Sequence, residues 1–215
     1  MTTPLVIIGA GGFGREIPEI VDAINTASPG AWELLGFLDD GQPDAERLAR
    51  LELPHLGAVD GGDDLPHGTH FVIGVGSGAV RRKLREAAER RGLVPATLVH
   101  PTATVGRDVR IGVGSVLCAG VSVTTNVDLG DFTILNLGVT VGHDTVLEDY
   151  VTVHPQAALS GECRIGTDVV MGTSSAIIQG RAVGARTTVG GGAVIVKDLP
   201  EDVTAVGAPA KPLTR

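Results

Sequence analysis

The sequence contains few aromatic side chains, since Phe, Trp and Tyr together make up 3% of its 215 residues. A conventional core of this size packs more large rings, so smaller side chains must fill this one. Two cysteines are too few for a disulfide framework or a cysteine-built zinc site. No apolar run reaches the length of a membrane span, and Met1-Thr2-Thr3 lacks the basic start of a signal peptide. We therefore expect a cytoplasmic protein.

Basic side chains are also scarce, with 17 Lys and Arg against 25 Asp and Glu, which gives a net charge of −8. An acidic chain is a poor ligand for nucleic acids and for anionic membranes, so neither is an expected partner. Glycine is abundant instead, at 31 residues.

A repeat of six residues fills the second half of the chain. From Val99 the sequence divides into sixes without an insertion, and every block through the one at Ile195 begins with Val, Ile, Leu or Met. The second position of a block is often glycine, as in Gly106, Gly112, Gly130, Gly142, Gly166, Gly172, Gly184 and Gly190. An ordinary alternating β-protein would place its turns at irregular spacing, so the period favours a solenoid.

The repeat predicts a parallel β-helix over residues 97–200, followed by a C-terminal cap segment over 201–215. Each block supplies a short strand and a corner, and three successive blocks make one coil. Aliphatic first positions point inward, and we expect the glycines to serve corners where a positive φ is needed.

The front of the chain, residues 1–96, lacks this repeat and forms a separate domain. An apolar strand at 5–8, a helical stretch to Ala23, a second strand ending at Asp39-Asp40 and a third at 71–76 alternate before a helix at 79–91. This order predicts a small Rossmann-like α/β domain with a parallel sheet.

The motif GAGGFG at residues 9–14 lies between the first strand and the helix that follows it. Such glycines let phosphates approach backbone N–H groups at a helix N-terminus, although the motif alone often marks only a tight turn. A carboxylate after the second strand can hold a ribose or a base edge. Three strands are too few for a dinucleotide dehydrogenase, so we expect a nucleotide-containing ligand other than NAD. Its candidate contacts are Gly9, Gly11, Gly12, Phe13, Gly14, Asp39, Asp40, Gly76 and Ser77.

His143 lies at an outward position of its block, beside Asp144. A neighbouring carboxylate can fix the tautomer of a histidine and raise its basicity, and a solvated surface pair is the alternative. Residues three blocks apart stack in a regular coil, so Asn136 and His154 are expected to stack and to cluster with His143. A structural ladder of hydrogen bonds is the alternative role for His154. The histidine spacing matches no zinc ligand set, so we expect no metal.

The repeat array resembles the left-handed β-helix of the hexapeptide-repeat acyltransferases. The closing segment VGGGAVIVKDLP at 189–200, with VGAPAK at 206–211, is similar to the C-terminal signature of that family. With the front domain included, the chain resembles the nucleotide-sugar N-acetyltransferases of the bacillosamine and perosamine type and the related sialic-acid-pathway acyltransferases.

The resemblance implies roles for individual residues and a homotrimer. His143 matches the general base, Asp144 the acidic residue that orients it, and Asn136 a polar position on the sugar side. Some members carry His where this chain has Thr152, and Phe13 replaces the usual His of the glycine loop. Coenzyme A is expected to contact Thr152, His154, Gly161, Gly172, Thr173 and Gly191.

The function implied is acetyl-CoA-dependent N-acetylation of the amino group, at C4, of a nucleotide-linked amino-deoxy sugar. An O-acyltransferase acting on a sugar or sialic-acid hydroxyl would use the same fold and base, so the sequence barely separates the two. A non-enzymatic binding solenoid is the third interpretation, and it requires neither a His-Asp pair nor a nucleotide-type front domain.

Overall fold

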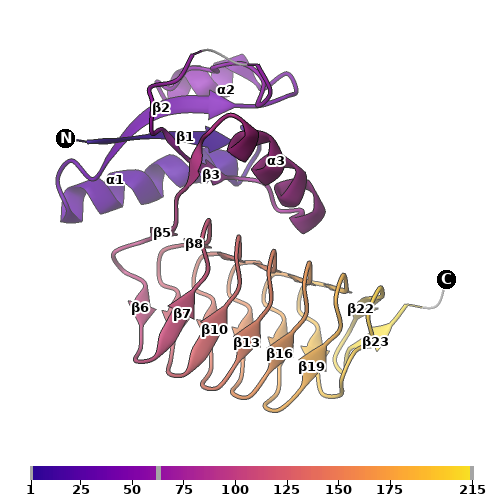
Figure 1. Ribbon diagram of the computed structural model, residues 1–215. Coiled ribbons are helices and arrows are strands. Elements are labelled where there is room, and N and C mark those ends of the chain that lie inside the picture. Colours follow the sequence, from indigo (N-terminus) through magenta and orange to yellow (C-terminus); the bar gives the residue numbers. More distant parts are fainter. Residues whose placement is uncertain (1, 62–63, 214–215) are drawn as a thin grey trace. The chain divides into compact units, whose positions relative to one another are not determined.

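The computed structural model describes residues 2–61 and 64–213. The chain divides into two compact units, Met1–Leu98 and Val99–Arg215. Both expected architectures are confirmed: the front unit is a parallel sheet with helices, and the second is a parallel β-solenoid (Figure 1).

The sheet of the front unit has the strand order β2-β1-β3-β4, and all its pairings are parallel. Its strands are β1 (Thr3–Ile8), β2 (Trp32–Leu38), β3 (His70–Ile73) and β4 (Val94–Pro95). The short β4 is not among the strands expected from the sequence. Leu5 to Ile8 are fully buried in the middle of this sheet, which explains their unbroken apolar run.

The helical segments of this unit are η1 (Gly14–Glu16), α1 (Ile17–Ala27), α2 (Ala45–Arg50) and α3 (Gly78–Arg90). Two of them begin at side-chain caps, since Asp44 accepts from the N–H of Arg47 and Ser77 accepts from the N–H of Val80. Because β2 and β3 lie on opposite sides of β1, the sheet has its topological switch point at the carboxyl end of β1.

The solenoid has three sheets, one for each face of the coil. The eight-stranded sheet contains β5 (Leu98–Val99), β8 (Val116–Leu117), β11 (Ile134–Leu135), β14 (Thr152–Val153), β17 (Val170–Met171), β20 (Thr188–Val189), β22 (Thr204–Val206) and β23 (Lys211–Pro212). The six-stranded sheet contains β6 (Thr104–Val105), β9 (Ser122–Val123), β12 (Thr140–Val141), β15 (Ala158–Leu159), β18 (Ala176–Ile177) and β21 (Val194–Ile195). The five-stranded sheet contains β7 (Val109–Ile111), β10 (Val127–Leu129), β13 (Val146–Leu147), β16 (Arg164–Ile165) and β19 (Ala182–Val183).

Neighbouring coils pair in a register of three blocks, as in Leu135 with Val153 and Val153 with Met171. The first positions of the blocks form the buried core, with small residues such as Cys163 between them. This core contains no aromatic ring among the described residues. The two rings of Phe132 and Tyr150 stack at a corner instead, with centroids 5.6 Å apart.

The expected role of the second-position glycines is wrong. Positive φ occurs at the fourth position of every block from the one at Val105 to the one at Val189, for example at Asp144 (57°) and Gly138 (65°), and not at the second. A Cβ atom on a second-position glycine would meet the next coil: at Gly166 it would lie 2.7 Å from the backbone nitrogen of Ala185. These glycines therefore permit the close approach of stacked backbones.

The last coil is shorter than the others. A full coil of three blocks would pair Thr188 with Val206, but Thr188 pairs with Thr204 instead. Through this pairing β22 still adds a strand to the eight-stranded sheet. The expected cap segment, 201–215, thus begins inside the solenoid. Antiparallel pairing of β23 with β22 ends that sheet.

Candidate functional site

In each coil the chain turns a corner after its strand in the six-stranded sheet. The predicted His143 lies at this corner, which we call the histidine corner. After β12 it contains Gly142, His143 and Asp144. The Nδ1 atom of His143 lies 2.7 Å from Oδ2 of Asp144, and both side chains are about half exposed (49% and 48%). Because an ionised carboxylate only accepts hydrogen bonds, the neutral imidazole carries its proton on Nδ1 and has its lone pair on Nε2.

The pKa of Asp144 is lowered from its ordinary value by the hydrogen bond with His143 and, next, by a hydrogen bond with Asn126. Asn126 Nδ2 donates to Asp144 Oδ1 over 3.1 Å. Asn126 is absent from the predicted site. The signal that could have found it is the period, because Asn126 precedes Asp144 by three blocks, which is one coil.

Gly161 lies one coil after His143 in the same corner. A Cβ atom at Gly161 would lie 2.5 Å from Nε2 and 2.6 Å from Cε1 of His143. The basic edge of the imidazole therefore faces a backbone with no side chain on it. Gly161 is one of the predicted coenzyme A contacts, and the structure brings it against the candidate base.

Asn136 lies elsewhere, at the corner that follows the eight-stranded sheet, which we call the asparagine corner. It is 8% exposed, and its Oδ1 accepts from the N–H of Leu137 over 2.7 Å. Asn136 and His154 stand one coil apart there, as the period predicts, since the preceding residues Leu135 and Val153 pair. Strand β12 separates this corner from His143, so a single chain does not bring Asn136 and His143 together.

The residues predicted to bind coenzyme A divide between these positions. Gly172 follows His154 on the asparagine corner, and Thr173 and Gly191 stack there, with the N–H of Gly192 bonded to the carbonyl of Thr173. Thr152 is different, because it lies in β14 and is only 2% exposed. Its side chain offers no surface to a ligand, so the structure removes it from the candidate set.

The glycine loop of the front unit contains two kinds of glycine. A Cβ atom at Gly14 would overlap the carbonyl oxygen of Gly9, so these two serve backbone packing. At Gly11 and Gly12 a Cβ atom would meet nothing within 4 Å. The open pair is where a ligand can approach the backbone. Phe13, between them and Gly14, is partly buried at the start of η1.

The two acidic residues after β2, Asp39 and Asp40, make different contacts. Asp39 accepts from the N–H of Ala10 over 2.7 Å and from that of Gly41 over 2.8 Å, so it braces the glycine loop. Asp40 Oδ1 accepts from Val59 N–H over 2.8 Å, and Oδ2 has no hydrogen bond to the residues described. Both carboxylates line a cavity of about 190 Å³ whose other walls are Ile8, Gly9, Val59, Val75, Val80 and Leu84.

The loop after β3 completes this edge of the sheet. A Cβ atom at Gly76 would meet nothing within 4 Å, so Gly76 is as open as Gly12. Ser77 caps α3, and its hydroxyl already accepts from Val80. The buried Arg81 donates to the carbonyls of Val75 and Gly76 over 2.9 Å each and fixes the loop.

An arginine cluster beside Gly12 was missed by the sequence analysis. Arg15, Arg47 and Arg50 line a second opening of about 500 Å³ with Gly12, Glu16 and Leu51. Arg15 in η1 and the two arginines of α2 are far apart in the sequence and meet only in the folded protein. Their spacing along the chain therefore gave no indication of the cluster. The cluster supplies positive charge next to the open glycines.

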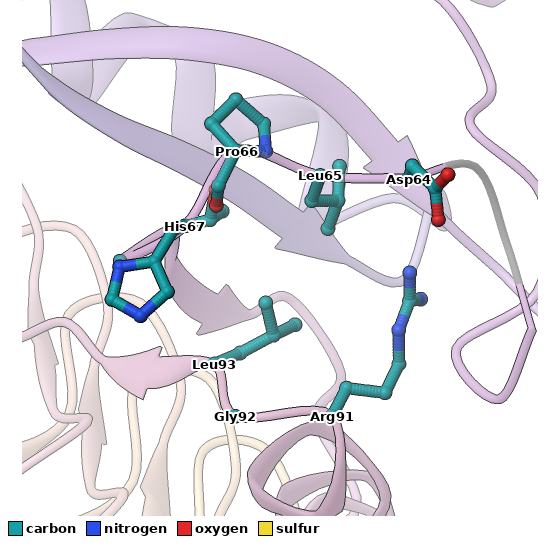
Figure 2. Close-up of a pocket in the computed structure, with 9 residues that line it drawn as sticks. Asp64, Leu65, Pro66, His67, Arg91, Gly92 and Leu93 are labelled. Atoms are coloured by element: carbon teal, nitrogen blue, oxygen red, sulfur yellow. The ribbon is translucent and has the colours of Figure 1, made fainter.

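A further cavity of about 420 Å³ lies at the opposite, amino-terminal edge of the sheet, where residues 64–69 lead into β3 and residues 91–93 into β4. Figure 2 shows the side chain of Arg91 extended toward Asp64. Arg91 also donates to the carbonyl of Val59 over 2.8 Å, which ties it to the fold. No predicted site residue lines this cavity.

Across residues 2–61 and 64–213, no group of three or more His, Cys, Asp and Glu side chains is arranged to hold a metal ion. None of the helices in those ranges is long and apolar enough to cross a membrane.

Comparisons with known proteins bear on both units. Residues 4–88 match the family described as the PglD N-terminal domain. The chain is 28% identical to the GDP-perosamine N-acetyltransferase of Escherichia coli O157:H7, covering 97% of this chain and 96% of that protein. It is 33% identical to the acetyltransferase domain of PglB from Neisseria gonorrhoeae FA1090, solved in complex with acetyl coenzyme A, with a TM-score of 0.84 and coverage of 99% and 100%. It is 31% identical to PerB from Caulobacter crescentus, solved with CoA and GDP-perosamine, with a TM-score of 0.85 and coverage of 100% and 99%.

Proposed function

Because this chain belongs to the hexapeptide-repeat sugar N-acetyltransferases, we propose that it acetylates the C4 amino group of a nucleotide-linked amino-deoxy sugar with acetyl-CoA. The observation that carries the proposal is the pair His143–Asp144, whose geometry leaves Nε2 as a free base at a surface corner.

The reaction we propose is direct transfer. The neutral sugar amine attacks the thioester carbonyl, a C–N bond forms, and His143 Nε2 accepts the proton that the amine loses. Asp144 stabilises the resulting imidazolium through Nδ1. The C–S bond then breaks, and the proton passes from His143 to the departing CoA sulfur. Neither a covalent enzyme intermediate nor a metal takes part.

We assign the oxyanion contact to the backbone N–H of Gly161. This group has no hydrogen-bond partner within the described parts of the chain, and its residue packs against the His143 ring. A donor fixed beside the base stabilises negative charge as it develops on the thioester oxygen. The missing side chain at Gly161 leaves room for the imidazole ring beside this N–H.

The nucleotide end of the substrate belongs to the front unit. We place the base in the cavity beside Asp40, whose free Oδ2 can accept from a base N–H. The diphosphate then lies over Gly11 and Gly12, where backbone N–H groups and the arginine cluster neutralise its charge. Binding of the nucleotide, a part of the substrate that does not react, positions the amine for attack.

We infer a homotrimer from the positions of the two corners. His143 and Gly161 lie on the histidine corner, whereas Asn136, His154, Gly172, Thr173 and Gly191 lie on the asparagine corner. The two sets can form one site only if the histidine corner of one copy meets the asparagine corner of its neighbour. Repeating this head-to-tail contact around a threefold axis closes a ring with three equivalent grooves for coenzyme A.

The test is release of CoA thiol from acetyl-CoA with UDP-, GDP- and dTDP-linked 4-amino-4,6-dideoxy sugars as acceptors. Wild type is compared with His143→Ala and with His100→Ala, a matched histidine of the solenoid whose Nδ1 bonds only locally to Thr102. We expect turnover with one acceptor, lost by a factor of about 10² to 10⁴ in His143→Ala at little change in KM.

Two results would contradict the proposal. Turnover of His143→Ala within a few-fold of wild type would remove the general-base assignment. Absence of turnover on every amino sugar, with acetylation of a matched sugar hydroxyl, would make the enzyme an O-acyltransferase instead.

A further inference from the structure

A single column of corner residues runs past the candidate base. It consists of fourth-position residues in the left-handed conformation, one from each of four successive coils, with φ between 53° and 58°: Asp108, Asn126, Asp144 and Glu162. Each residue lies one coil from the next. Three of the four carry carboxylates, and Asn126 is the neutral member, placed between Asp108 and Asp144.

Asn126 has a defined partner for the donor end of its amide, since Nδ2 donates to Asp144 Oδ1 over 3.1 Å. The single hydrogen of the neighbouring Thr125 hydroxyl has two acceptors within reach, the carbonyl of Arg107 at 2.9 Å and Oδ1 of Asn126 at 3.3 Å, and it serves only one of them at a time. The backbone N–H of Asn126 donates to the carbonyl of Arg107 over 3.2 Å. The residue is therefore anchored to the preceding coil through its backbone, and its amide is aimed at Asp144.

Both oxygens of Asp144 are engaged, Oδ1 by Asn126 and Oδ2 by His143. The carboxylate is about half exposed, so without the amide it could rotate toward water or away from Glu162, the like charge one coil on. Holding one oxygen holds the other in place for Nδ1, because the carboxylate is planar and rigid.

We propose that Asn126 is a positioning residue of the acetyl transfer: its amide holds Asp144 so that His143 keeps its proton on Nδ1 and presents Nε2 to the amine. This inference rests on the proposed function for its kinetic consequence. The tautomer itself is a property of the unliganded protein. A neutral donor is required at this point, because a carboxylate at position 126 would repel Asp144 and offer it no hydrogen.

The variant that tests this is Asn126→Gly, since glycine adopts the observed φ of 54° without strain and removes only the amide. Asp108→Gly makes the same kind of change one coil earlier, at φ 53°, without touching Asp144. We expect kcat of Asn126→Gly to fall about 10-fold with KM unchanged, and Asp108→Gly to match wild type. Asn126→Asp, which keeps the shape and loses the donor, is expected to lose as much as Asn126→Gly.

A merely structural role of Asn126 would leave the tautomer of neutral His143 unchanged. This tautomer is measured from imidazole ¹⁵N chemical shifts without substrates. The signal is assigned by its absence in His143→Ala. We expect the share of His143 protonated on Nδ1 to fall in Asn126→Gly and to stay at the wild-type value in Asp108→Gly. In an Asp144→Ala background, Asn126→Gly should cause no additional loss of kcat, because its effect passes through Asp144.

An unchanged tautomer and a kcat within twofold of wild type in Asn126→Gly would overturn the inference. An equal loss of kcat in the Asp144→Ala background would overturn it too, since the amide would then act by another route. If wild type acetylates no amino sugar, the proposed function fails, while the ¹⁵N measurement still decides whether Asn126 controls the tautomer.

Discussion

Gly161 packs against the imidazole of His143 so closely that a Cβ atom on Gly161 would lie 2.5 Å from Nε2. A methyl group there must push the ring out of place. We predict that Gly161→Ala lowers kcat about 10²-fold, because a displacement of the base by about 1 Å misaligns the proton transfer. Steady-state kinetics check the effect, and circular dichroism confirms that the solenoid is retained. A folded variant with kcat near wild type would show that the ring has room to move.

The protonation state of Asp144 leads to a prediction about the pH dependence of the reaction. Its pKa is lowered from 3.8 by the hydrogen bonds from His143 and Asn126, so the folded state favours the carboxylate. The stabilisation is therefore present above the unfolded pKa and is lost only as the pH falls through the lower, folded value. Asp144 stays ionised at neutral and mildly acidic pH.

We accordingly expect Asp144→Asn to lower kcat/KM about 10-fold on the pH-independent plateau of the profile, because no carboxylate then stabilises the imidazolium. The measurement is the pH profile of kcat/KM for both proteins. Loss of the wild-type acid limb in Asp144→Asn would mean that Asp144 itself titrates over that limb.

The glycine loop offers a matched pair of variants. Gly14→Ala places a methyl group on the carbonyl of Gly9, and we expect it to destabilise the front unit by about 3 kcal/mol through overpacking. Gly12→Ala adds the same methyl group where nothing lies within 4 Å, so the free energy of unfolding should stay within about 0.5 kcal/mol of wild type.

Denaturant unfolding of the two variants checks this difference. Gly12→Ala should also raise KM for the nucleotide sugar, because the methyl group occupies the approach to the backbone. Equal stabilities of the two variants would contradict the distinction between packed and open glycines.

The two cysteine thiols should be unreactive in the native protein. Cys118 is 2% exposed and Cys163 is fully buried, and burial raises the pKa of the Cys163 thiol above its ordinary 9.0. At pH 8 the neutral thiol is favoured, so we expect a chromogenic disulfide reagent to label neither residue until the chain is unfolded in denaturant. Rapid labelling of the native protein would contradict the burial. Unreactive cysteines also let the same reagent report CoA release without a background signal.

Local chemistry explains which parts of the fold and site were predictable. Leu135, Val153 and Met171 reveal the solenoid because every coil places the same position inward. His143 and Asp144 are neighbours in the chain, and their contact needs only a corner. The glycines were recognised but given the wrong task, since close approach between coils and a positive φ both favour glycine.

The sequence by itself determined the repeat, the division into two units, the parallel sheet and the His-Asp pair, because each depends on periodicity or on adjacent residues. Only the tertiary structure decided that Asn126 holds Asp144, that Gly161 faces His143, that Asp39 braces the loop while Asp40 lines the cavity, and that Asn136 lies on another corner. These relationships join residues from different coils, strands or loops. Which side chains meet across such distances depends on register and backbone direction, which packing fixes only when the whole chain has folded.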